Sequence, residues 1–366
     1  MAPIQPVGWW YYLTNQTTFP PVNLAHFFYL SWEDALWDLL KYFGCQAGSI
    51  ILVPDFYCDD VVKNMSAHGL IVQTYPVDRG FQTSVKIFKQ YLKKYQPDLV
   101  VIFHAVGITN KLLNKAEKWL DVLPKNSLLI EDSVHRVIDS KKISLITERH
   151  VIIDSLRKVV PLQGSNLYGP KSLLSALKPT PINQTLIYRL KVLWWWILFQ
   201  CCLLMVLVLP FQKWQQWWNK LAELTMLVGY DHIGDSQLAG SGFSFFKNLS
   251  FKINHQHIFI TKVNQVELYQ KLLEPLWQSK QFFRINFAQR DYGKLRAFPV
   301  GLFLDDAVEI LNKLRSNGLM VRFELDNFGW TKRQKVIYLP LGPHLKEKDI
   351  FKISQIFLTV IFNKKF

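Results

Sequence analysis

Hydrophobic residues in the first half of the chain form short, nearly continuous aliphatic runs separated by longer amphipathic segments. The runs cover residues 50–54, 70–75, 99–103, 128–130 and 151–154, and the amphipathic segments cover 31–43, 59–68, 84–95 and 111–123. Strands buried on both faces have continuous apolar sequences, and their alternation with helices is typical of a parallel sheet covered by helices. The pattern predicts a large α/β domain over residues 31–185, preceded by an N-terminal arm over 1–30.

The last part of the chain, residues 231–366, has a different pattern. We expect a strand over 258–263, a helix over 265–277, a strand over 298–304, a helix over 305–316 with Gly318 as its C-cap, apolar runs at 321–325 and 336–341, and a terminal helix over 346–362. This order predicts a smaller α+β domain.

An apolar segment lies between the two regions. Residues 192–211 contain one polar side chain, Gln200, and no charge. Twenty helical residues rise about 30 Å, roughly the thickness of a bilayer's hydrocarbon core. Basic residues precede the segment, and Lys213 with three tryptophans follows it, which is typical of a membrane interface. We therefore predict an inserted apolar helical segment over 186–230.

A single membrane crossing conflicts with a shared active site, because it would place residues 1–190 and 212–366 on opposite sides. The alternatives are a hairpin that turns near Pro210, a helix in the plane of the interface, and a helix buried in a soluble dimer. We favour a peripheral or monotopic membrane contact through residues 192–218. The formal net charge of +15 supports this choice, because an anionic leaflet attracts basic residues.

Composition excludes several classes of protein. With 49% hydrophobic and 19% charged residues, the chain can form a core and is not disordered. The four cysteines have no metal-ligand spacing, so we expect neither a metal site nor a disulfide scaffold, and a reducing compartment fits. No signal peptide is evident, which favours a cytoplasmic location. The lysines between 86 and 94 follow helical spacing, so we expect a solvated face and no nucleic acid partner.

Residues that can carry chemistry follow the predicted strands. They are Phe56, His104, Asp132, His135, Ser155 and Lys158. Ligands of open parallel sheets gather at the carboxyl ends of the strands. A carboxylate and a lysine at neighbouring strand ends fit pyridoxal phosphate chemistry, in which the lysine forms a Schiff base with the cofactor and the carboxylate pairs with the pyridinium nitrogen.

The stretches ALWDLLKYFGCQAGSIILVPDFYC, LVVIFHAVG, LLIEDSVH and IIDSLRKVVPLQGS give the chain a resemblance to a known family. It resembles a divergent member of the DegT-type (StrS-like) sugar aminotransferases, which have fold type I of the enzymes that use pyridoxal 5'-phosphate (PLP). The resemblance implies that Lys158 is the Schiff-base lysine and general acid/base. It places Asp132 at the pyridine nitrogen, His135 near the ring hydroxyl and Ser155 at the phosphate. We also expect Phe56 and His104 in the cofactor pocket, and Arg322 either at a substrate anion or in a surface salt bridge.

One departure from the family concerns the phosphate end of the cofactor. The family has Ser-Gly-Thr or Gly-Arg before its Ala-Leu, and this chain has Ser31-Trp32-Glu33-Asp34. In the family that helix start, to which Ser31 corresponds, binds the phosphate through backbone N–H groups, and glycine permits close approach. Ser31 and Asp34 also form a capping-box pattern. The two carboxylates would repel a phosphate, so either the phosphate is held elsewhere, with Arg157 as a compensating cation, or the cofactor no longer binds.

The resemblance implies a homodimeric, PLP-dependent aminotransferase. It would move an amino group from an amino acid to a keto-sugar, and membrane contact indicates a cell-envelope or glycan pathway. The competing hypothesis is a cofactor-free, non-catalytic relative that acts as a membrane-associated partner or scaffold. Trp32 and Glu33 favour that alternative, and the presence of both Asp132 and Lys158 opposes it.

Overall fold

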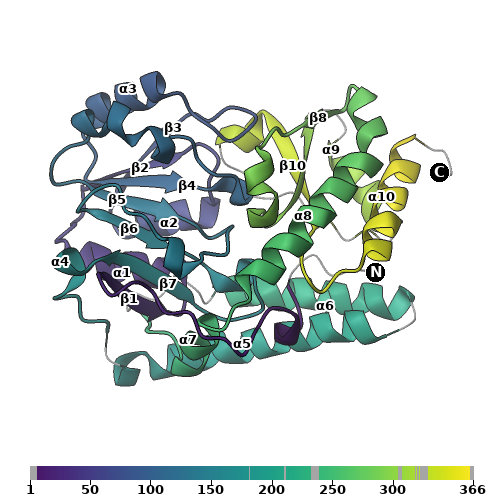
Figure 1. Ribbon diagram of the computed structural model, residues 1–366, viewed down its shortest axis with the longest axis horizontal. Coiled ribbons are helices and arrows are strands. Elements are labelled where there is room, and N and C mark those ends of the chain that lie inside the picture. The colour runs from purple at the N-terminus through teal and green to yellow at the C-terminus, as the bar shows by residue number, and fades with distance from the viewer. Residues whose placement is uncertain are drawn as a thin grey trace.

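Two β-sheets form the framework of the protein, and a long helical hairpin lies along one side of it (Figure 1). The computed structural model describes residues 6–180, 182–209, 212–231, 239–303, 307–317, 319, 321 and 329–362. Gly318, Arg322 and most of the 321–325 run lie outside the described residues.

The larger sheet has seven strands in the order β1-β7-β6-β5-β4-β2-β3. Their bounds are Leu24–Tyr29 (β1), Ile50–Pro54 (β2), Ile71–Tyr75 (β3), Leu99–Phe103 (β4), Leu128–Asp132 (β5), His150–Ile153 (β6) and Ser165–Pro170 (β7). Strands β2 to β6 pair in parallel, which confirms the predicted parallel sheet. The sequence analysis missed β1 and β7, which add an antiparallel edge.

Helices α1 (Trp32–Tyr42), α2 (Asp59–Ala67) and α3 (Val85–Tyr95) lie where the amphipathic segments predict them. The predicted helix over 111–123 is wrong, because this segment forms the 3-10 turns η3 (Leu113–Lys118) and η4 (Leu120–Val122). The side chain of Trp119 is fully buried, and its indole N–H donates to the carbonyl of Leu112 at 2.9 Å. A backbone φ of −139° at Trp119 interrupts any continuous helix there.

The smaller sheet has the order β10-β9-β8 and is antiparallel. Its strands are Phe282–Arg284 (β8), Ala297–Phe303 (β9) and Gln334–Pro340 (β10), and its helices are α8 (His255–Leu272), α9 (Ala307–Ser316) and α10 (Glu347–Phe362). The predicted strand over 258–263 is wrong, because it lies inside α8. The Asn254 side chain caps that helix, and Ile258, Lys262, Val266 and Tyr269 are buried at helical spacing.

The remaining elements are short. They are η1 (Trp9–Tyr11), η2 (Ala105–Gly107), η5 (Ser140–Lys142), η6 (Leu156–Lys158), α4 (Lys171–Leu174), α7 (Ser244–Ser250), η7 (Glu274–Gln278), η8 (Gln289–Lys294) and η9 (Gly329–Lys332).

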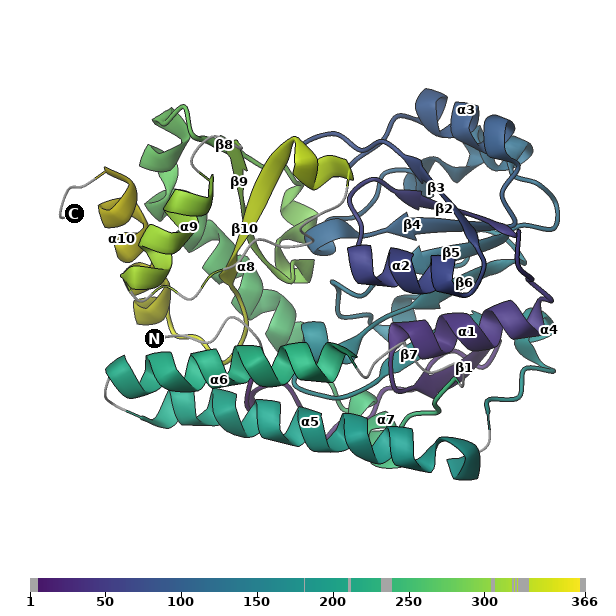
Figure 2. The same cartoon turned by 180° about the vertical axis from the view of Figure 1, so that it is seen from behind.

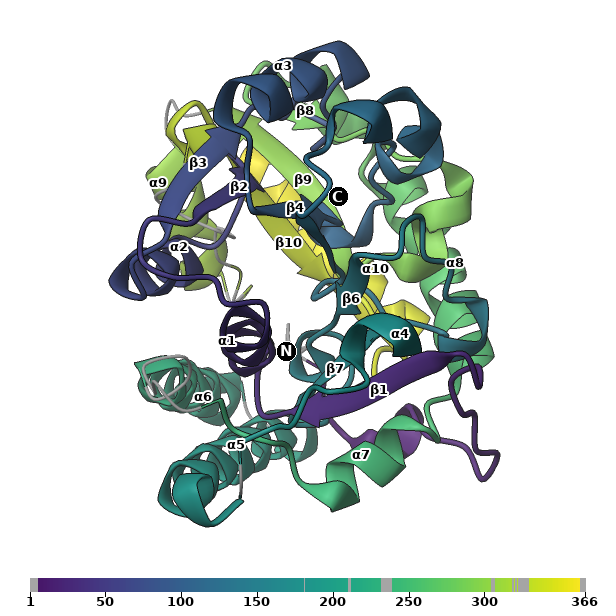
Figure 3. The ribbon, with the colours of Figure 1, turned by 90° about the vertical axis from the view of Figure 1, so that its left-hand side faces the viewer.

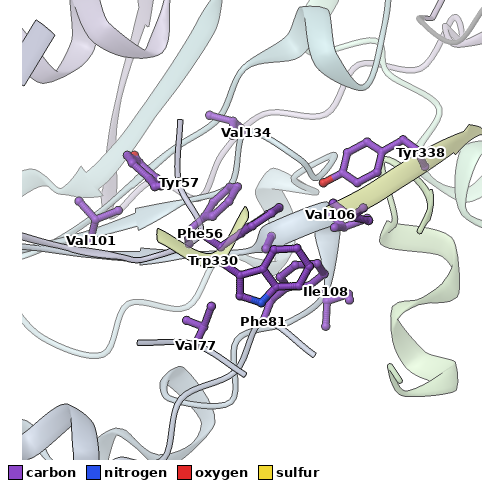
Figure 4. Close-up of a cluster of buried hydrophobic side chains, with 14 of the residues drawn as sticks. Phe56, Tyr57, Val77, Phe81, Val101, Val106, Ile108, Val134, Trp330 and Tyr338 are labelled. Carbon is purple, nitrogen blue, oxygen red and sulfur yellow. The ribbon is translucent and has the colours of Figure 1, made fainter. Parts of the chain in front are cut away.

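An aromatic cluster joins the two sheets (Figure 4). Phe56 follows β2, and its ring centroid lies 4.4 Å from Phe81 and 5.0 Å from Trp330 of η9. The Trp330 indole N–H donates to the carbonyl of Asp78 at 2.9 Å. Edge and offset contacts between buried rings stabilise beyond their buried area. The cluster therefore fixes η9 of the second sheet against the end of β2.

The apolar segment belongs to a helical hairpin of α5 (Ile182–Val208) and α6 (Gln212–Asp231), which run side by side along the edge of the molecule (Figures 2 and 3). In the described part of the chain, one helix is long and apolar enough to cross a membrane, Thr185–Val208, with mean hydropathy 2.0 and 28% of the apolar window buried. Val192 and Val206 face the protein, whereas Ile187, Trp194 and Val208 are exposed.

The buried carboxyl group of Asp34 holds the hairpin to the large sheet. It accepts hydrogen bonds from the Gly240 N–H at 2.7 Å, from the Ser31 hydroxyl at 2.5 Å and from the Tyr188 hydroxyl of α5 at 3.2 Å. The chain at Gly240 passes so close that a Cβ there would lie 2.7 Å from Leu30. Burial raises the pKa of Asp34 to about 7.

We expect Asp34→Ala to lower the free energy of unfolding by about 2–3 kcal/mol, because the buried Gly240 N–H loses its acceptor. Urea unfolding at pH 6, where the carboxyl group is mostly protonated, measures the loss. Tyr188→Phe is the matched control and removes only the longest of the three bonds, at a cost of about 1 kcal/mol. An Asp34→Ala protein as stable as the original would show that this junction does not anchor the hairpin.

Candidate active site

Lys158 lies at the tip of the loop between β6 and β7. The Asp154 carboxylate closes the base of this loop by accepting the Asn166 backbone N–H at 2.6 Å and its side-chain N–H at 2.9 Å. Higher in the loop, the Leu156 N–H donates to the carbonyl of Gly164 at 2.9 Å. Gly164 has φ +134°, and a Cβ there would lie 2.3 Å from the Phe28 ring, so the position requires glycine. The loop holds Lys158 in one place.

Asp132 ends β5, the strand beside β6, and its side chain is buried. The Tyr57 hydroxyl donates to Oδ2 at 2.6 Å, and the Val134 N–H donates to Oδ1 at 3.0 Å. Burial raises the pKa of Asp132 to about 6, and the Tyr57 and Val134 hydrogen bonds and the positive charge of Lys158 oppose that rise. The positive charge of Lys158 thus affects the pKa of Asp132, after burial and the two hydrogen bonds.

The start of α1 lies in the same neighbourhood. Burial raises the pKa of Glu33, and the positive charges of Arg157 and Lys158 oppose the rise. The Trp32 ring packs edge-on against Tyr57 with centroids 6.3 Å apart. The buried Trp32 indole N–H has no hydrogen-bond partner among the described residues. The end of β5, the loop after β6 and the start of α1 thus converge on one region.

The helical hairpin covers this region from one side. A pocket of about 40 Å³ is lined by Lys158, Arg157 and Gln163 of the loop, by Val192, Trp195, Trp196 and Phe199 of α5, and by Thr225, Met226 and Gly229 of α6. Its volume is far below the roughly 300–1,000 Å³ of typical ligand pockets. Lys158 therefore faces the hairpin across a narrow gap.

The other predicted site residues have structural partners. Ser31 is the N-cap of α1, since its hydroxyl accepts the Asp34 N–H at 3.1 Å, which confirms the first half of the capping box, whereas the Asp34 carboxyl group accepts the Ser31 hydroxyl. His104 is fully buried, with Nε2 2.8 Å from Glu131 and Nδ1 accepting the Asn110 N–H at 3.1 Å. It therefore stabilises the sheet edge.

His135 lies just after β5, at the carboxyl ends of β4 and β5. Its Nδ1 accepts the Val106 N–H at 3.0 Å, and its Nε2 lies 2.9 Å from Arg296. Ser155 is buried at the start of η6, and Phe56 belongs to the aromatic cluster rather than to the Lys158 pocket. Arg322 lies outside the described residues. Within the described part of the chain, no group of three His, Cys, Asp or Glu side chains can hold a metal ion.

The sequence analysis missed two contributions to the site. Tyr57 contacts the Asp132 carboxylate, and Figure 4 shows that the rings of Tyr57 and Phe56 point in different directions. The available signal was its position beside Phe56 after β2. The hairpin residues that face Lys158 gave no local signal, because an apolar helix segment does not reveal what it packs against.

Comparisons with known proteins identify the fold. No protein-family model matches this chain, and no curated protein matches it. Among solved structures it is similar to a NifS-like protein from Rickettsia africae, with 12% identity, a TM-score of 0.58 and coverage of 93% of this chain and 82% of the other. It is also similar to 3-amino-5-hydroxybenzoic acid synthase, with 10% identity, a TM-score of 0.57 and coverage of 93% and 87%.

A third similar structure is NtdA from Bacillus subtilis with bound cofactor PMP, at 12% identity, a TM-score of 0.54 and coverage of 92% and 73%. These likenesses confirm the predicted fold class, the α/β fold type I of PLP-dependent aminotransferases. Membership of the DegT-type family stays a prediction.

The raised pKa of Asp132 predicts a pH-dependent stability. A carboxyl group with a folded pKa near 6 and an ordinary value near 3.8 binds its proton more tightly in the folded state, so stability falls as pH rises from about 4 to 6. Relative to Asp132→Asn, we expect the original protein to lose about 3 kcal/mol across that window and no more above it. Urea unfolding of both proteins from pH 4 to 8 measures the difference, and a constant difference would contradict the assignment.

Proposed function

We propose that the protein is a PLP-dependent aminotransferase in which Lys158 binds the cofactor and moves the substrate proton. The observation that carries the proposal is the convergence of Lys158 with the buried Asp132 carboxyl group at neighbouring strand ends. The fold adds support, because NtdA, a structure of the same fold, binds PMP.

The side chains in this region fit both ends of the cofactor. The Asp132 carboxylate is a buried acceptor suited to a pyridinium N–H, and its bond from Tyr57 orients it. At the start of α1, the unpartnered Trp32 indole N–H and the Arg157 guanidinium are a donor and a cation suited to a phosphate. Ser155 and His135 remain predicted contacts of the phosphate and the ring hydroxyl.

Each residue has a separate task in the reaction. PLP, when bound, accepts the electrons that the substrate α-carbon releases on losing its proton. Asp132 keeps a negative charge at the ring nitrogen above its pKa of about 6. With the cofactor bound, Lys158 would take the proton from the α-carbon of the donor, and in the second half of the reaction it would deliver a proton to the acceptor carbon that gains the amino group. Trp195 and Trp196 of α5 line the Lys158 pocket and exclude water from it.

We propose a keto-sugar as amino acceptor, an amino acid as donor and a homodimer as the working form. The DegT-type resemblance supports these assignments, as does the basic net charge of +15, which suits a phosphate-bearing acceptor. The division into an arm (1–30), a large domain (31–185), the hairpin segment (186–230) and a small domain (231–366) is part of the same proposal.

A spectrum tests the activity. We expect the protein incubated with PLP to gain a visible absorption band that borohydride removes while attaching the cofactor covalently to Lys158, identified by peptide mass spectrometry. Lys158→Ala should lose the band, and Lys63→Ala, an exposed lysine of α2, should keep it. A Lys158→Ala protein that keeps the visible absorption band at full strength would contradict the assignment of this residue.

A cofactor-free, non-catalytic relative is the second candidate. It is favoured by the Glu33 carboxylate, which faces Arg157 and Lys158 where a phosphate would lie, and by the small free volume of about 40 Å³ beside Lys158. In that case PLP produces no visible band and no rise in the unfolding temperature of the original protein.

We further propose that the α5–α6 hairpin contacts the cytoplasmic face of a membrane. Its outward surface carries Trp194, Ile187 and Val208 from α5 and Trp214 and Trp217 from α6, each more than half exposed. The helix lies along the protein rather than away from it (Figure 2), so a contact in the plane of the interface fits better than a crossing.

Replacing two of these tryptophans tests the membrane contact. We expect the double variant Trp194→Glu, Trp217→Glu to bind vesicles of phosphatidylglycerol at least tenfold more weakly, because charged side chains enter the interface at a cost. The double variant Lys63→Ala, Lys142→Ala changes the net charge equally at exposed sites and is the control. Co-sedimentation measures both, and equal binding by all three proteins would contradict the contact.

A further inference from the structure

A second cavity lies on the other side of α5 from the hairpin partner α6. Its volume is about 350 Å³, it is partly open to solvent, and it is lined by η1, α5, α7 and the loop after η6. The walls include Trp9, Pro161, Trp196, Ile197, Leu204 and Phe245, and Gln200 is the one polar side chain among the lining residues. A cavity of this size falls within the range of ligand pockets, and its lining suits a hydrocarbon.

This cavity adjoins the candidate active site. Trp196 lines both the apolar cavity and the Lys158 pocket, so one indole ring forms the wall between them. Pro161, in the same loop as Lys158, also lines the apolar cavity. The Trp196 ring packs against Phe246 of α7 at 4.8 Å, which holds the wall in position. The apolar cavity therefore lies on the other side of Trp196 from the Lys158 pocket.

The two pockets differ in charge. Arg157 and Lys158 line the small pocket, whereas none of the described residues that line the larger cavity is charged. The nearby Arg189 guanidinium stacks on the Phe243 ring, whose centroid is 4.5 Å away. This division matches an amphiphile with an anionic head and a single hydrocarbon chain. A bilayer would instead cover the exposed outer face of the hairpin.

We propose that the apolar cavity binds the hydrocarbon chain of a lipid-linked phosphate substrate whose head group reaches Lys158. The inference rests on the proposed function for the role of the head group, and it narrows the amino acceptor from any keto-sugar to one carried on a lipid. Binding of the chain itself requires only the cavity.

Calorimetric titration with hexyl, octyl and decyl phosphate below their micellar concentrations tests the chain site. Each methylene group buried in the cavity should raise the affinity about fourfold. Ile197→Trp fills the cavity and should weaken decyl phosphate binding at least tenfold. Ile187→Trp, the same substitution at an exposed position of α5 outside the cavity, should leave it unchanged. Leu204→Ala enlarges the cavity and should extend the chain length at which the affinity stops rising.

Other outcomes would overturn the proposal. An affinity independent of chain length shows phosphate binding without a chain site. Equal weakening by Ile197→Trp and Ile187→Trp places the alkyl chain on the outer face, as for a bilayer, and loss of a dimer in Ile197→Trp by sedimentation assigns the cavity to a second copy. Borohydride labelling of Lys158 is a separate measurement. A protein that binds alkyl phosphates but not PLP would contradict the proposed aminotransferase activity and would still support the chain site.

Discussion

The parallel pairing of β5 with β6 is the constraint on which the candidate site depends. The register sets Asp132 at the end of β5 beside Ile153 at the end of β6. The Asp132 carboxylate and the loop that follows β6 therefore lie at the same end of the sheet. The carboxyl ends of parallel strands are where α/β folds gather their ligands. If the pairing slipped by one residue, the Asp132 side chain would point to the opposite face of the sheet and away from the Lys158 loop.

Buried acids join the other parts of the molecule to this edge. Burial raises the pKa of Asp34 and of Asp154 to about 7, so ionisation of either carboxyl group lowers the stability of the folded protein. Each also connects distant segments, because Asp34 links α1 to the hairpin and Asp154 links β6 to β7. Buried polar groups are kept where all their partners are satisfied, and these two meet that condition with backbone N–H donors.

The parallel strands could be predicted from sequence because strands buried on both faces have continuous apolar runs, which can be recognised without knowledge of the residues that surround them. Strands β1 and β7 could not, since Ser165–Pro170 contains no such run, and its place in the sheet depends on pairing with β1 and β6 and on the Asn166 side chain, which bonds to Asp154. Helix α8 was mistaken in part for a strand because Ile258–Val263 is rich in β-branched residues, and packing of its buried face overrides that preference. At the site, Asp132 and Lys158 could be predicted from strand ends, whereas the contact from Tyr57 depends on side-chain direction, which spacing does not fix.

The α5–α6 hairpin places the apolar segment of the sequence beside the candidate active site. One face of α5 covers Lys158 through Trp195 and Trp196, another lines the apolar cavity through Ile197 and Leu204, and a third is exposed at Trp194. A helix with three apolar faces has no reason to be amphipathic, which explains why its sequence resembles a membrane span while it lies against the protein. The apolar composition of this segment therefore serves packing on two faces of the helix and, in the proposed membrane contact, the interface on the third.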